Sequence, residues 1–232
     1  MRSLTARRVR REPMAYILGE REFWGLPFKV TPAVLVPRPD SETVIEATLH
    51  LMPDRARAWR ILDLGLGSGC LLLSLLHEYR QAQGVGLEAS PEALAVAQEN
   101  ARALGLAGRA RLVAGDWRTT SWADSLGGPF DLVVSNPPYV RADVVDRLMP
   151  EVASFEPRLA LDGGPQGLDA YRIIVAAGPK LVASGGLMAL EVGEGQALEI
   201  SNLLMAVGLT PLASWRDLGG IERVVVARHQ QD

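Results

Sequence analysis

Residues 61–69 read ILDLGLGSG, and this stretch decides the fold. The stretch begins with a short apolar run that is typical of a buried strand. The glycines that follow let the backbone turn sharply and approach a ligand closely. A second apolar stretch continues to about Tyr79 and predicts a helix. A strand, a glycine-rich turn and a helix form the first part of a βαβ unit, from which parallel sheets covered by helices are built.

The same alternation of strand and helix continues to the end of the chain. The pattern predicts strands at residues 61–64, 85–88, 110–114, 130–135, 187–192, 211–217 and 222–228. It predicts helices at residues 70–79, 90–104, 169–182 and 195–207. Ser90 is expected to cap the second of these helices, and Gly178-Pro179 to bend or end the third. The last two strands are joined by too few residues for a parallel crossover, so they should pair antiparallel. We therefore predict an α/β fold with a mostly parallel seven-stranded sheet and an antiparallel final hairpin.

The N-terminal part of the chain has a different character. Residues 1–20 are a charged lead-in with room for one helical turn. Residues 22–36 carry aromatic and β-branched residues that are interrupted by Gly25-Leu26-Pro27. This pattern predicts a small β-hairpin whose prolines take edge positions.

A helix should follow the hairpin and run to about Met52. Asp40 or Ser41 is expected as its N-cap, because both side chains readily accept a hydrogen bond from the first helical turn. The predicted division is an N-terminal segment, residues 1–52, with the lead-in, hairpin and helix, and a main domain, residues 53–232.

Composition limits the classes of function. The chain has 232 residues, 48% of them hydrophobic, which suffices for one sizeable core. A net charge of −3 and a pI near 5.7 weigh against a nucleic-acid substrate, because proteins that grip phosphates usually present a basic face. The single cysteine, Cys70, excludes an intramolecular disulfide and fits a reducing cytoplasm. No apolar run approaches the roughly 18 residues that span a bilayer. We interpret the arginines of residues 2–11 as a solvated start rather than a transit peptide.

Three groups of residues fall at the carboxyl ends of predicted strands, where ligands bind in open α/β sheets. They are the turn at residues 65–69, Glu88 and Asp116-Trp117. Glu88 follows Gly65 by 23 residues, near the roughly 20 expected of an acid that accepts hydrogen bonds from ribose hydroxyls. Trp117 is suited to stack on adenine. These groups predict a nucleoside site, while a tight strand-to-helix connection without a ligand is the open alternative.

The spacing of the glycines favours a cofactor without phosphates. NAD prefers Gly-x-Gly-x-x-Gly, whereas residues 65–69 have the compact spacing Gly-x-Gly-x-Gly. That form suits S-adenosylmethionine, which becomes S-adenosylhomocysteine when it gives up its methyl group. Asp63 or backbone carbonyls near the turn would receive its ammonium group, unless Asp63 is a structural carboxylate that accepts backbone N–H groups. The predicted cofactor-binding residues are Gly65, Leu66, Gly67, Ser68, Gly69, Glu88, Asp116 and Trp117.

The segment Asn136-Pro137-Pro138-Tyr139 is the most specific feature of the sequence, and it directly follows a predicted strand. The prolines stiffen the backbone and remove two donors, which leaves acceptors at the bend: the Asn136 side-chain oxygen and the Pro137 carbonyl. A planar amide or amine presents two N–H groups that such acceptors hold together. Tyr139 is expected to stack on the planar group. The segment predicts catalysis by positioning and electrostatics, so no histidine is required as a general base.

At this point the chain closely resembles the HemK/PrmC family, the methyltransferases that modify the glutamine of the Gly-Gly-Gln motif in peptide chain release factors. The resemblance covers about residues 12–226. The matching pieces are residues 13–19 (PMAYILG), 23–25 (FWG), 36–42 (VPRPDSE), 63–69, 116–117, 135–139, 155–157 (FEP), 163–164 and 167–168. It implies a Rossmann-like class I methyltransferase, contact of residues 65–69, Glu88, Trp117 and Asn136 with the cofactor, and a glutamine amide held by Asn136, Pro137, Pro138 and Tyr139.

The chain departs from the family pattern at three places. Family members usually carry a helical N-terminal domain that helps dock the release factor, and almost all of it is missing here. Leu66 stands where a small or hydroxylated residue is commoner, and Glu88 where Asp is commoner.

Arg38 and Glu42 are expected to pair with each other or to frame the substrate channel.

We therefore predict an enzyme that methylates a protein glutamine with S-adenosylmethionine, with a release factor as its partner. The first alternative is methylation of an exocyclic base amine of RNA or DNA. The second is a binding module that keeps the cofactor fold without activity. We expect a cytoplasmic monomer with no metal site and no attachment to a membrane.

Overall fold

A computed structural model describes residues 2–230 and has a seven-stranded sheet at its centre. Its strands are β3 (Arg60–Leu64), β4 (Gln83–Glu88), β5 (Ala110–Ala114), β6 (Phe130–Ser135), β7 (Val182–Glu191), β8 (Leu209–Arg216) and β9 (Glu222–His229). Across the sheet they follow the order β5-β4-β3-β6-β7-β9-β8. The strands β3 to β7 pair in parallel, while β9 pairs antiparallel with both β7 and β8. The predicted mostly parallel sheet and its antiparallel final hairpin are confirmed.

The strand order reverses beside β3. The chain runs outward from β3 to β5 and then returns to β6 on the other side of β3. Open α/β sheets bind their ligands at such a reversal, beyond the carboxyl ends of the strands. The topology therefore places a binding site where β3, β4 and β6 end.

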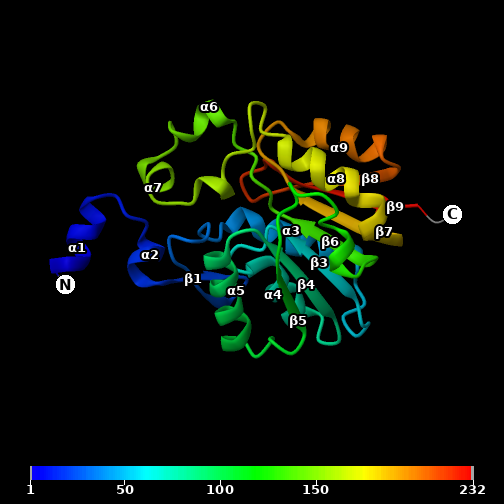
Figure 1. The fold of residues 1–232 in the computed structure, drawn as a ribbon, viewed down its shortest axis with the longest axis horizontal. Helices are drawn as coiled ribbons and strands as arrows, with labels where there is room; N and C mark the ends of the chain where they lie inside the picture. The colour runs from blue at the N-terminus through cyan, green and yellow to red at the C-terminus, as the bar shows by residue number, and fades with distance from the viewer. Residues whose placement is uncertain (1, 231–232) are drawn as a thin grey trace.

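Helices cover both faces of the sheet (Figure 1). One face carries α3 (Glu42–Leu51), α4 (Cys70–Glu78) and α5 (Pro91–Ala103), and the other carries α8 (Asp169–Leu181) and α9 (Ala197–Ala206). Alternate residues of each central strand point to opposite faces, so Leu132 and Val134 pack with the first group and Val133 with the second. Strands buried on both faces need near-continuous apolar sequence, which is how residues 130–135 read.

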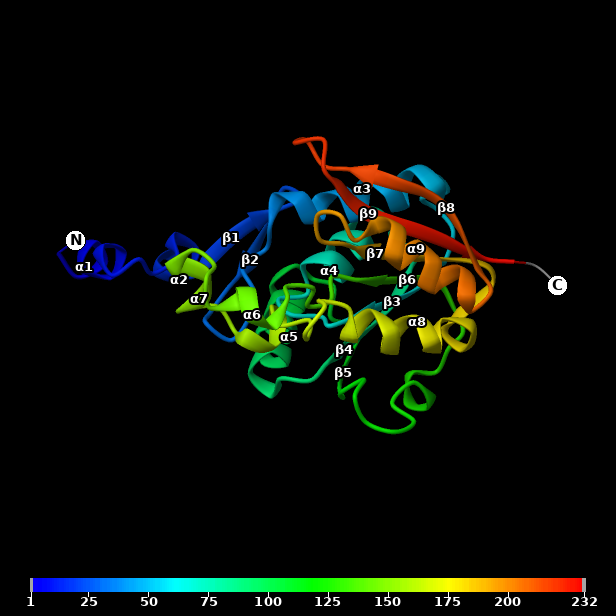
Figure 2. The same ribbon diagram turned by 90° about the horizontal axis from the view of Figure 1, so that it is seen from above.

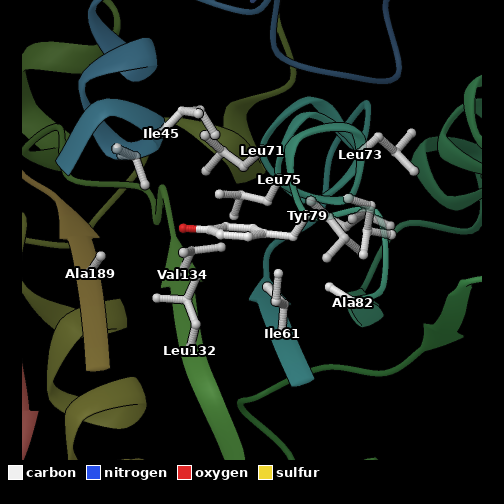
Figure 3. Packing of buried hydrophobic residues seen from close by; sticks show 14 of the residues in the cluster. Ile45, Ile61, Leu71, Leu73, Leu75, Tyr79, Ala82, Leu132, Val134 and Ala189 are labelled. Carbon is white, nitrogen blue, oxygen red and sulfur yellow. The ribbon is translucent and has the colours of Figure 1, made fainter. Parts of the chain in front are cut away.

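Tyr79 shows how tightly the first of these cores is packed. Its ring follows α4 and lies among Leu75, Ile61 and Val134 (Figure 3). The side chain is fully buried, and its hydroxyl donates to the carbonyl of Met52 at 2.9 Å. A buried phenol needs such a partner, since an unpaired hydroxyl would lose its hydration without compensation.

The N-terminal segment forms α1 (Arg2–Val9), α2 (Met14–Leu18) and a hairpin of β1 (Glu20–Phe23) and β2 (Leu26–Lys29). Helices α1 and α2 lie at one end of the molecule, far from the C-terminus (Figure 2). The hairpin turns at Trp24 and Gly25, which both have positive φ, as a two-residue hairpin loop of type I′ requires. The predicted small hairpin is confirmed, although it ends at Lys29 and residues 30–38 form no strand. The division of the chain at residue 52 stays a prediction.

One local prediction is wrong, and one of two alternatives for another is excluded. A 3-10 turn, η1 (Pro39–Ser41), leads directly into α3, so Ser41 has helical φ and ψ and its side chain makes no capping hydrogen bond. Asp40 lies inside the same turn. Pro179 does not end α8, which continues to Leu181, so of the two alternatives only a bend at Gly178-Pro179 stays a prediction. The predicted cap at Ser90 is confirmed, since its hydroxyl accepts from Ala93 N at 3.1 Å.

A long excursion between β6 and α8 crosses the ligand edge of the sheet. We call residues 141–168 the strap; it contains α6 (Ala142–Val145), α7 (Pro150–Ala153) and η3 (Arg158–Ala160). Backbone hydrogen bonds between Val140 and both Leu161 and Gly163 hold its two ends together. Glu151 of the strap pairs with Arg8 and Arg11 near the N-terminus. Figure 1 shows the strap reaching from the sheet toward α2.

Within residues 2–230, every helix is too short or too polar to span a bilayer.

Candidate active site

The carboxyl ends of four parallel strands lie side by side at one edge of the sheet. Ser135, the last residue of β6, pairs with Leu64 of β3 on one side and with Leu190 of β7 on the other. The residues that follow are neighbours too, so Asn136 lies between Gly65 and Glu191. A pocket of about 590 Å³ opens at this edge, a size usual for small-molecule sites.

The glycine turn forms one wall of this pocket. Gly65, Gly67 and Gly69 have φ of 78°, 56° and 84°, a region that residues with a Cβ avoid. A Cβ on Gly65 would lie 3.0 Å from the ring of Trp117, so the turn and the indole are in close contact. Gly65 and Gly67 line the pocket, whereas Gly69 begins α4 and packs against Leu73 instead.

The two larger residues of the turn are held in place by buried contacts. Leu66 lines the pocket but is only 3% exposed, because its side chain packs into the core beside Gly86. A large side chain at this position therefore leaves the pocket open. Ser68 is buried as well, and its carbonyl accepts a hydrogen bond from Asn100 Nδ2 at 2.8 Å.

Glu88 ends β4 beside the turn and is 8% exposed. Its Oε2 accepts from Gly67 N at 2.8 Å, and its Oε1 accepts from Ser90 N at 2.9 Å. Each carboxylate oxygen can accept a second hydrogen bond. Glu88 therefore fixes the turn and keeps lone pairs for donors in the pocket, such as ribose hydroxyls.

Asp63 lies beneath the turn and has an unsatisfied oxygen. It is 1% exposed; Oδ2 accepts from Leu72 N at 3.2 Å, while Oδ1 has no partner among the described residues. Burial raises the pKa of Asp63 to about 7, although the Leu72 N–H opposes this, and the charge of Glu88 raises it further. A cation would relieve this arrangement, because an opposite charge favours the ionised carboxyl. The residues thus fit a cofactor that carries a ribose and an ammonium group.

The predicted pair at the end of β5 also reaches the pocket. Trp117 lines it and is half-buried, with its ring against Gly65. Asp116 lines it too, but Arg118 engages both of its oxygens and holds the pKa of this carboxyl below its usual range.

Asn136 and Pro138 line the pocket beside the turn. Asn136 Nδ2 donates to Ser41 Oγ at 3.2 Å. Among the described residues, no donor reaches Asn136 Oδ1 or the carbonyl of Pro137. Asn136 and Pro138 line the pocket, while Pro137 is buried behind them. Two acceptors are therefore free at this bend, as the sequence predicted.

Tyr139 lies away from the pocket. Its ring packs against the core between the sheet and α8, and its hydroxyl donates to Glu191 Oε1 at 3.5 Å. Burial raises the pKa of Tyr139, and the charge of Glu191 raises it further. Gln196 Nε2 donates to the Tyr139 carbonyl at 3.2 Å. These contacts anchor the segment from behind, so Tyr139 is not in position to stack on a ligand.

The strap and the segment before α3 complete the pocket. Arg38 lines the pocket and pairs with Glu156 of the strap at 2.6 Å. Glu42 is not its partner, because the Glu42 carboxylate accepts a hydrogen bond from Trp24 N. The predicted Arg38–Glu42 pair is therefore wrong. Glu156 is 7% exposed, and burial raises its pKa although the Arg38 charge opposes this. The ion pair joins two sides of the pocket. The three histidines, His50, His77 and His229, do not line it.

Sequence reasoning missed Ser41 and Glu191 as members of the site. Glu191 is the last residue of β7, so it resembles Glu88: an acid at the carboxyl end of an apolar strand. That signal was available. Ser41 lies in the stretch 36–42 that matches the family, but no pattern joined it to Asn136, because the hydrogen bond between them spans 95 residues of sequence.

Comparison with known proteins agrees with this geometry. A family profile described as a methyltransferase domain matches residues 61–155. The release factor glutamine methyltransferase of Rhodospirillum rubrum is 47% identical over 99% of this chain and 69% of its own length. The protein of the same name from Bradyrhizobium diazoefficiens is 48% identical over 96% of this chain and 74% of its own length.

Two solved structures extend the comparison. The release-factor-specific protein-(glutamine-N5) methyltransferase of Alicyclobacillus acidocaldarius is 26% identical, with a TM-score of 0.51, over 88% of this chain and 99% of that one. A methyltransferase from Pyrococcus furiosus has a TM-score of 0.64 at 17% identity over 99% of this chain and 100% of that one, which is a likeness of fold alone.

Proposed function

The chain belongs to the release factor glutamine methyltransferases, which use S-adenosylmethionine, and we propose that Asn136 and Pro137 hold the side-chain amide of a release factor glutamine for methylation. We take this glutamine to be that of the Gly-Gly-Gln motif. One observation carries the proposal: Asn136, with a free acceptor oxygen, follows a strand that pairs with the strand leading into Gly65. When bound, S-adenosylmethionine supplies a methyl group on a positively charged sulfur and becomes S-adenosylhomocysteine.

Asn136 and Pro137 act on the acceptor nitrogen. Asn136 Oδ1 accepts one amide N–H and the Pro137 carbonyl accepts the other, which fixes the plane of the amide. An amide nitrogen is a weak nucleophile because its lone pair is delocalised. Two acceptors on its hydrogens return electron density to the nitrogen and stabilise the positive charge that develops there. The rigid prolines hold both acceptors in place before the substrate arrives.

Three residues near the glycine turn act on the cofactor. Glu88 accepts hydrogen bonds from the ribose hydroxyls through lone pairs that Gly67 and Ser90 leave free. Asp63 Oδ1 receives the ammonium group, which supplies the partner that this buried oxygen lacks. Trp117 contacts the adenine ring.

The charge of the pocket favours a protein over a nucleic acid as the substrate. Its wall carries six acidic side chains and two basic ones, Arg38 and Arg118. Both arginines are already paired with carboxylates. Phosphate groups would meet net repulsion here. The strap adds the uncharged residues Pro157, Leu159 and Ala160 to the wall, which suits a glycine-rich peptide loop.

We further propose that the chain works as a cytoplasmic monomer. Its free cysteine, Cys70, is half-buried in the wall of the pocket, and burial raises the pKa of its thiol to about 12. Light scattering after size exclusion should give a mass near 25.0 kDa. A mass of twice that value would contradict the monomer.

The proposed function is tested with isotope-labelled S-adenosylmethionine and a purified release factor. Mass spectrometry should find one labelled methyl group on the glutamine of its Gly-Gly-Gln motif, and a Gln→Ala release factor should take up none. Label on RNA, or label that persists on the Gln→Ala factor, would contradict the assigned substrate. Tight cofactor binding without transfer to any release factor would favour an inactive binding module.

A further inference from the structure

The backbone of the bend after β6 has few donors with which to hold itself in place. A loop is fixed by the hydrogen bonds of its backbone N–H and C=O groups. Pro137 and Pro138 have no N–H group, so the middle of the bend offers only carbonyl oxygens. The proposed function uses one of these, the Pro137 carbonyl, for the substrate amide. Donors that fix the backbone of the bend must therefore come from other parts of the chain.

Gln196, at the N-terminus of α9, supplies such a donor. Its Nε2 donates to the Tyr139 carbonyl at 3.2 Å and to the carbonyl of Gly167, at the end of the strap, at 3.3 Å. Its Oε1 accepts from Gly193 N at 2.9 Å. These backbone partners fix which end of the carboxamide faces which way, because an N–H only donates and a carbonyl only accepts. One side chain thus joins the bend after β6, the strap and the loop after β7.

Two buried glycines bring these segments close enough for Gln196 to reach all of them. A Cβ on Gly167 would overlap the carbonyl oxygen of Tyr139 and lie 2.9 Å from Gln196 Nε2. A Cβ on Gly193 would lie 2.8 Å from Gln196 Oε1, well inside the roughly 3.5 Å of ordinary contact. The carboxamide and the bend are therefore enclosed by backbone on two sides, which leaves the side chain little freedom to move.

We propose that Gln196 is a positioning residue for methyl transfer, which holds the bend so that its acceptors stay aimed at the substrate amide. This inference rests on the proposed function for what the acceptors bind, and on the contacts of Gln196 for what holds them. Gln196 is not among the described residues that line the pocket, so it acts through the bend. The Tyr139 carbonyl lies two residues after the Pro137 carbonyl, and the ring of Pro138 stiffens the backbone between them. Movement of the first carbonyl is therefore passed on to the second.

Two substitutions remove the contact in different ways. Gln196→Met keeps the length of the side chain but has no N–H group to donate. Gln196→Asn keeps the carboxamide but shortens the side chain by one methylene, so it cannot span the same gaps. This polar variant decides the role if Gln196→Met does not fold. Gln98→Met makes the first change at an exposed position of α5 and is the matched control.

Carbonyl NMR measures the contact itself. Of the four tyrosines in the chain, only Tyr139 is followed by a valine. Labelling tyrosine with ¹³C at the carbonyl and valine with ¹⁵N therefore gives a single signal for the peptide bond between Tyr139 and Val140. A hydrogen bond to a carbonyl deshields its carbon, so the signal should move upfield in both Gln196 variants and stay in place in Gln98→Met. An unchanged signal in a folded Gln196 variant would overturn the proposal.

Kinetics provide the second measurement. Both Gln196 variants should lower kcat for methyl transfer by about 10- to 100-fold, the range expected when a positioned group moves by up to about 1 Å. The Kd for S-adenosylhomocysteine should stay the same, and Gln98→Met should change neither quantity. An unchanged kcat in a variant whose Tyr139 signal has moved would contradict the proposed role. If the wild-type chain transfers no methyl group to a release factor, the proposed function fails, while the carbonyl signal still decides whether Gln196 holds the bend.

Discussion

The two walls of the pocket meet at neighbouring strand ends but are built in different ways. The cofactor-side wall, residues 63–68 with Glu88 and Trp117, comes from consecutive βαβ units and relies on backbone shape and buried carboxylates. The acceptor-side wall is assembled from distant segments and consists of Pro37, Arg38, Ser41, Asn136, Pro138, Pro157, Leu159, Ala160, Asp162 and Gly164. It relies on side-chain hydrogen bonds and ion pairs between them. The comparison teaches that a short motif can specify how a cofactor is bound, whereas the acceptor geometry depends on tertiary structure.

The largest effect should separate the functions of the two walls. Asn136→Ala removes the acceptor that the proposed function assigns to the reacting amide, so kcat should fall by about 100- to 1000-fold, as for loss of one preorganised hydrogen-bonding group. The Kd for S-adenosylhomocysteine should change far less. Steady-state methyl transfer and calorimetry measure the two quantities. Asn202→Ala is the exposed control, and a full loss of cofactor binding in Asn136→Ala would break the division between the walls.

The cofactor-side wall has its own matched pair of glycines. Gly65 and Gly105 have φ of 78° and 70°. Alanine at either position should lower the free energy of unfolding by about 1–2 kcal/mol, because a Cβ is strained there. Only Gly65→Ala also presses on Trp117, which lies 3.0 Å from the added Cβ. Overpacking of about 1–3 kcal/mol should therefore weaken cofactor binding in Gly65→Ala alone. Equal cofactor affinity in the two variants would show that the close contact has no effect on binding.

The first wall was predictable because its information is local. The glycines at 65, 67 and 69 and the acid at 88 stand at strand ends that periodicity alone identifies. The second wall was only partly predictable. The free acceptors after β6 follow from the Asn-Pro-Pro sequence, but the only partner considered for Arg38 was a sequence neighbour, Glu42. The actual partner, Glu156, is 118 residues away and becomes a neighbour only when the strap folds over the pocket. Tyr139 was placed on the wrong side of its segment, because no sequence pattern states which way a loop side chain turns.

A pH series should sharpen the role of Asp63. Burial raises its pKa to about 7, and the groups that face it are Glu88, the Leu72 N–H and the Cys70 thiol. An ammonium group is held by the ionised carboxyl, so the Kd for S-adenosylhomocysteine should be about 10-fold larger at pH 6 than at pH 8. Asp63→Asn should bind weakly and lose this dependence. Identical pH dependence in both proteins would assign the titration to another group.

The protein without cofactor should show the opposite trend in stability. The pKa of Asp63 in the folded state lies above the ordinary value for an aspartate. Such a group stabilises the fold below its unfolded pKa of about 4, and this contribution is lost as the pH rises through about 7. Denaturant titrations should therefore show that the wild type gains stability relative to Asp63→Asn as the pH falls from 8 to 5.

The smallest effect should come from the ion pair between Arg38 and Glu156. Arg38→Lys keeps the charge but loses the planar guanidinium that reaches the buried carboxylate. The KM for a release factor should rise by about 3- to 10-fold, equivalent to roughly 1 kcal/mol for a partly exposed pair, with cofactor binding unchanged. Arg147→Lys, on the exposed surface of the strap, is the matched control. An unchanged KM would show that the strap does not need this pair to shape the acceptor side.

The most direct measurement is a crystal structure with S-adenosylhomocysteine and a peptide that contains the Gly-Gly-Gln sequence. The account predicts that Asn136 Oδ1 and the Pro137 carbonyl each lie about 2.7–3.2 Å from the glutamine amide nitrogen. That nitrogen should face the sulfur beside Gly65. A glutamine side chain bound elsewhere, or an amide nitrogen that faces away from the sulfur, would contradict the account.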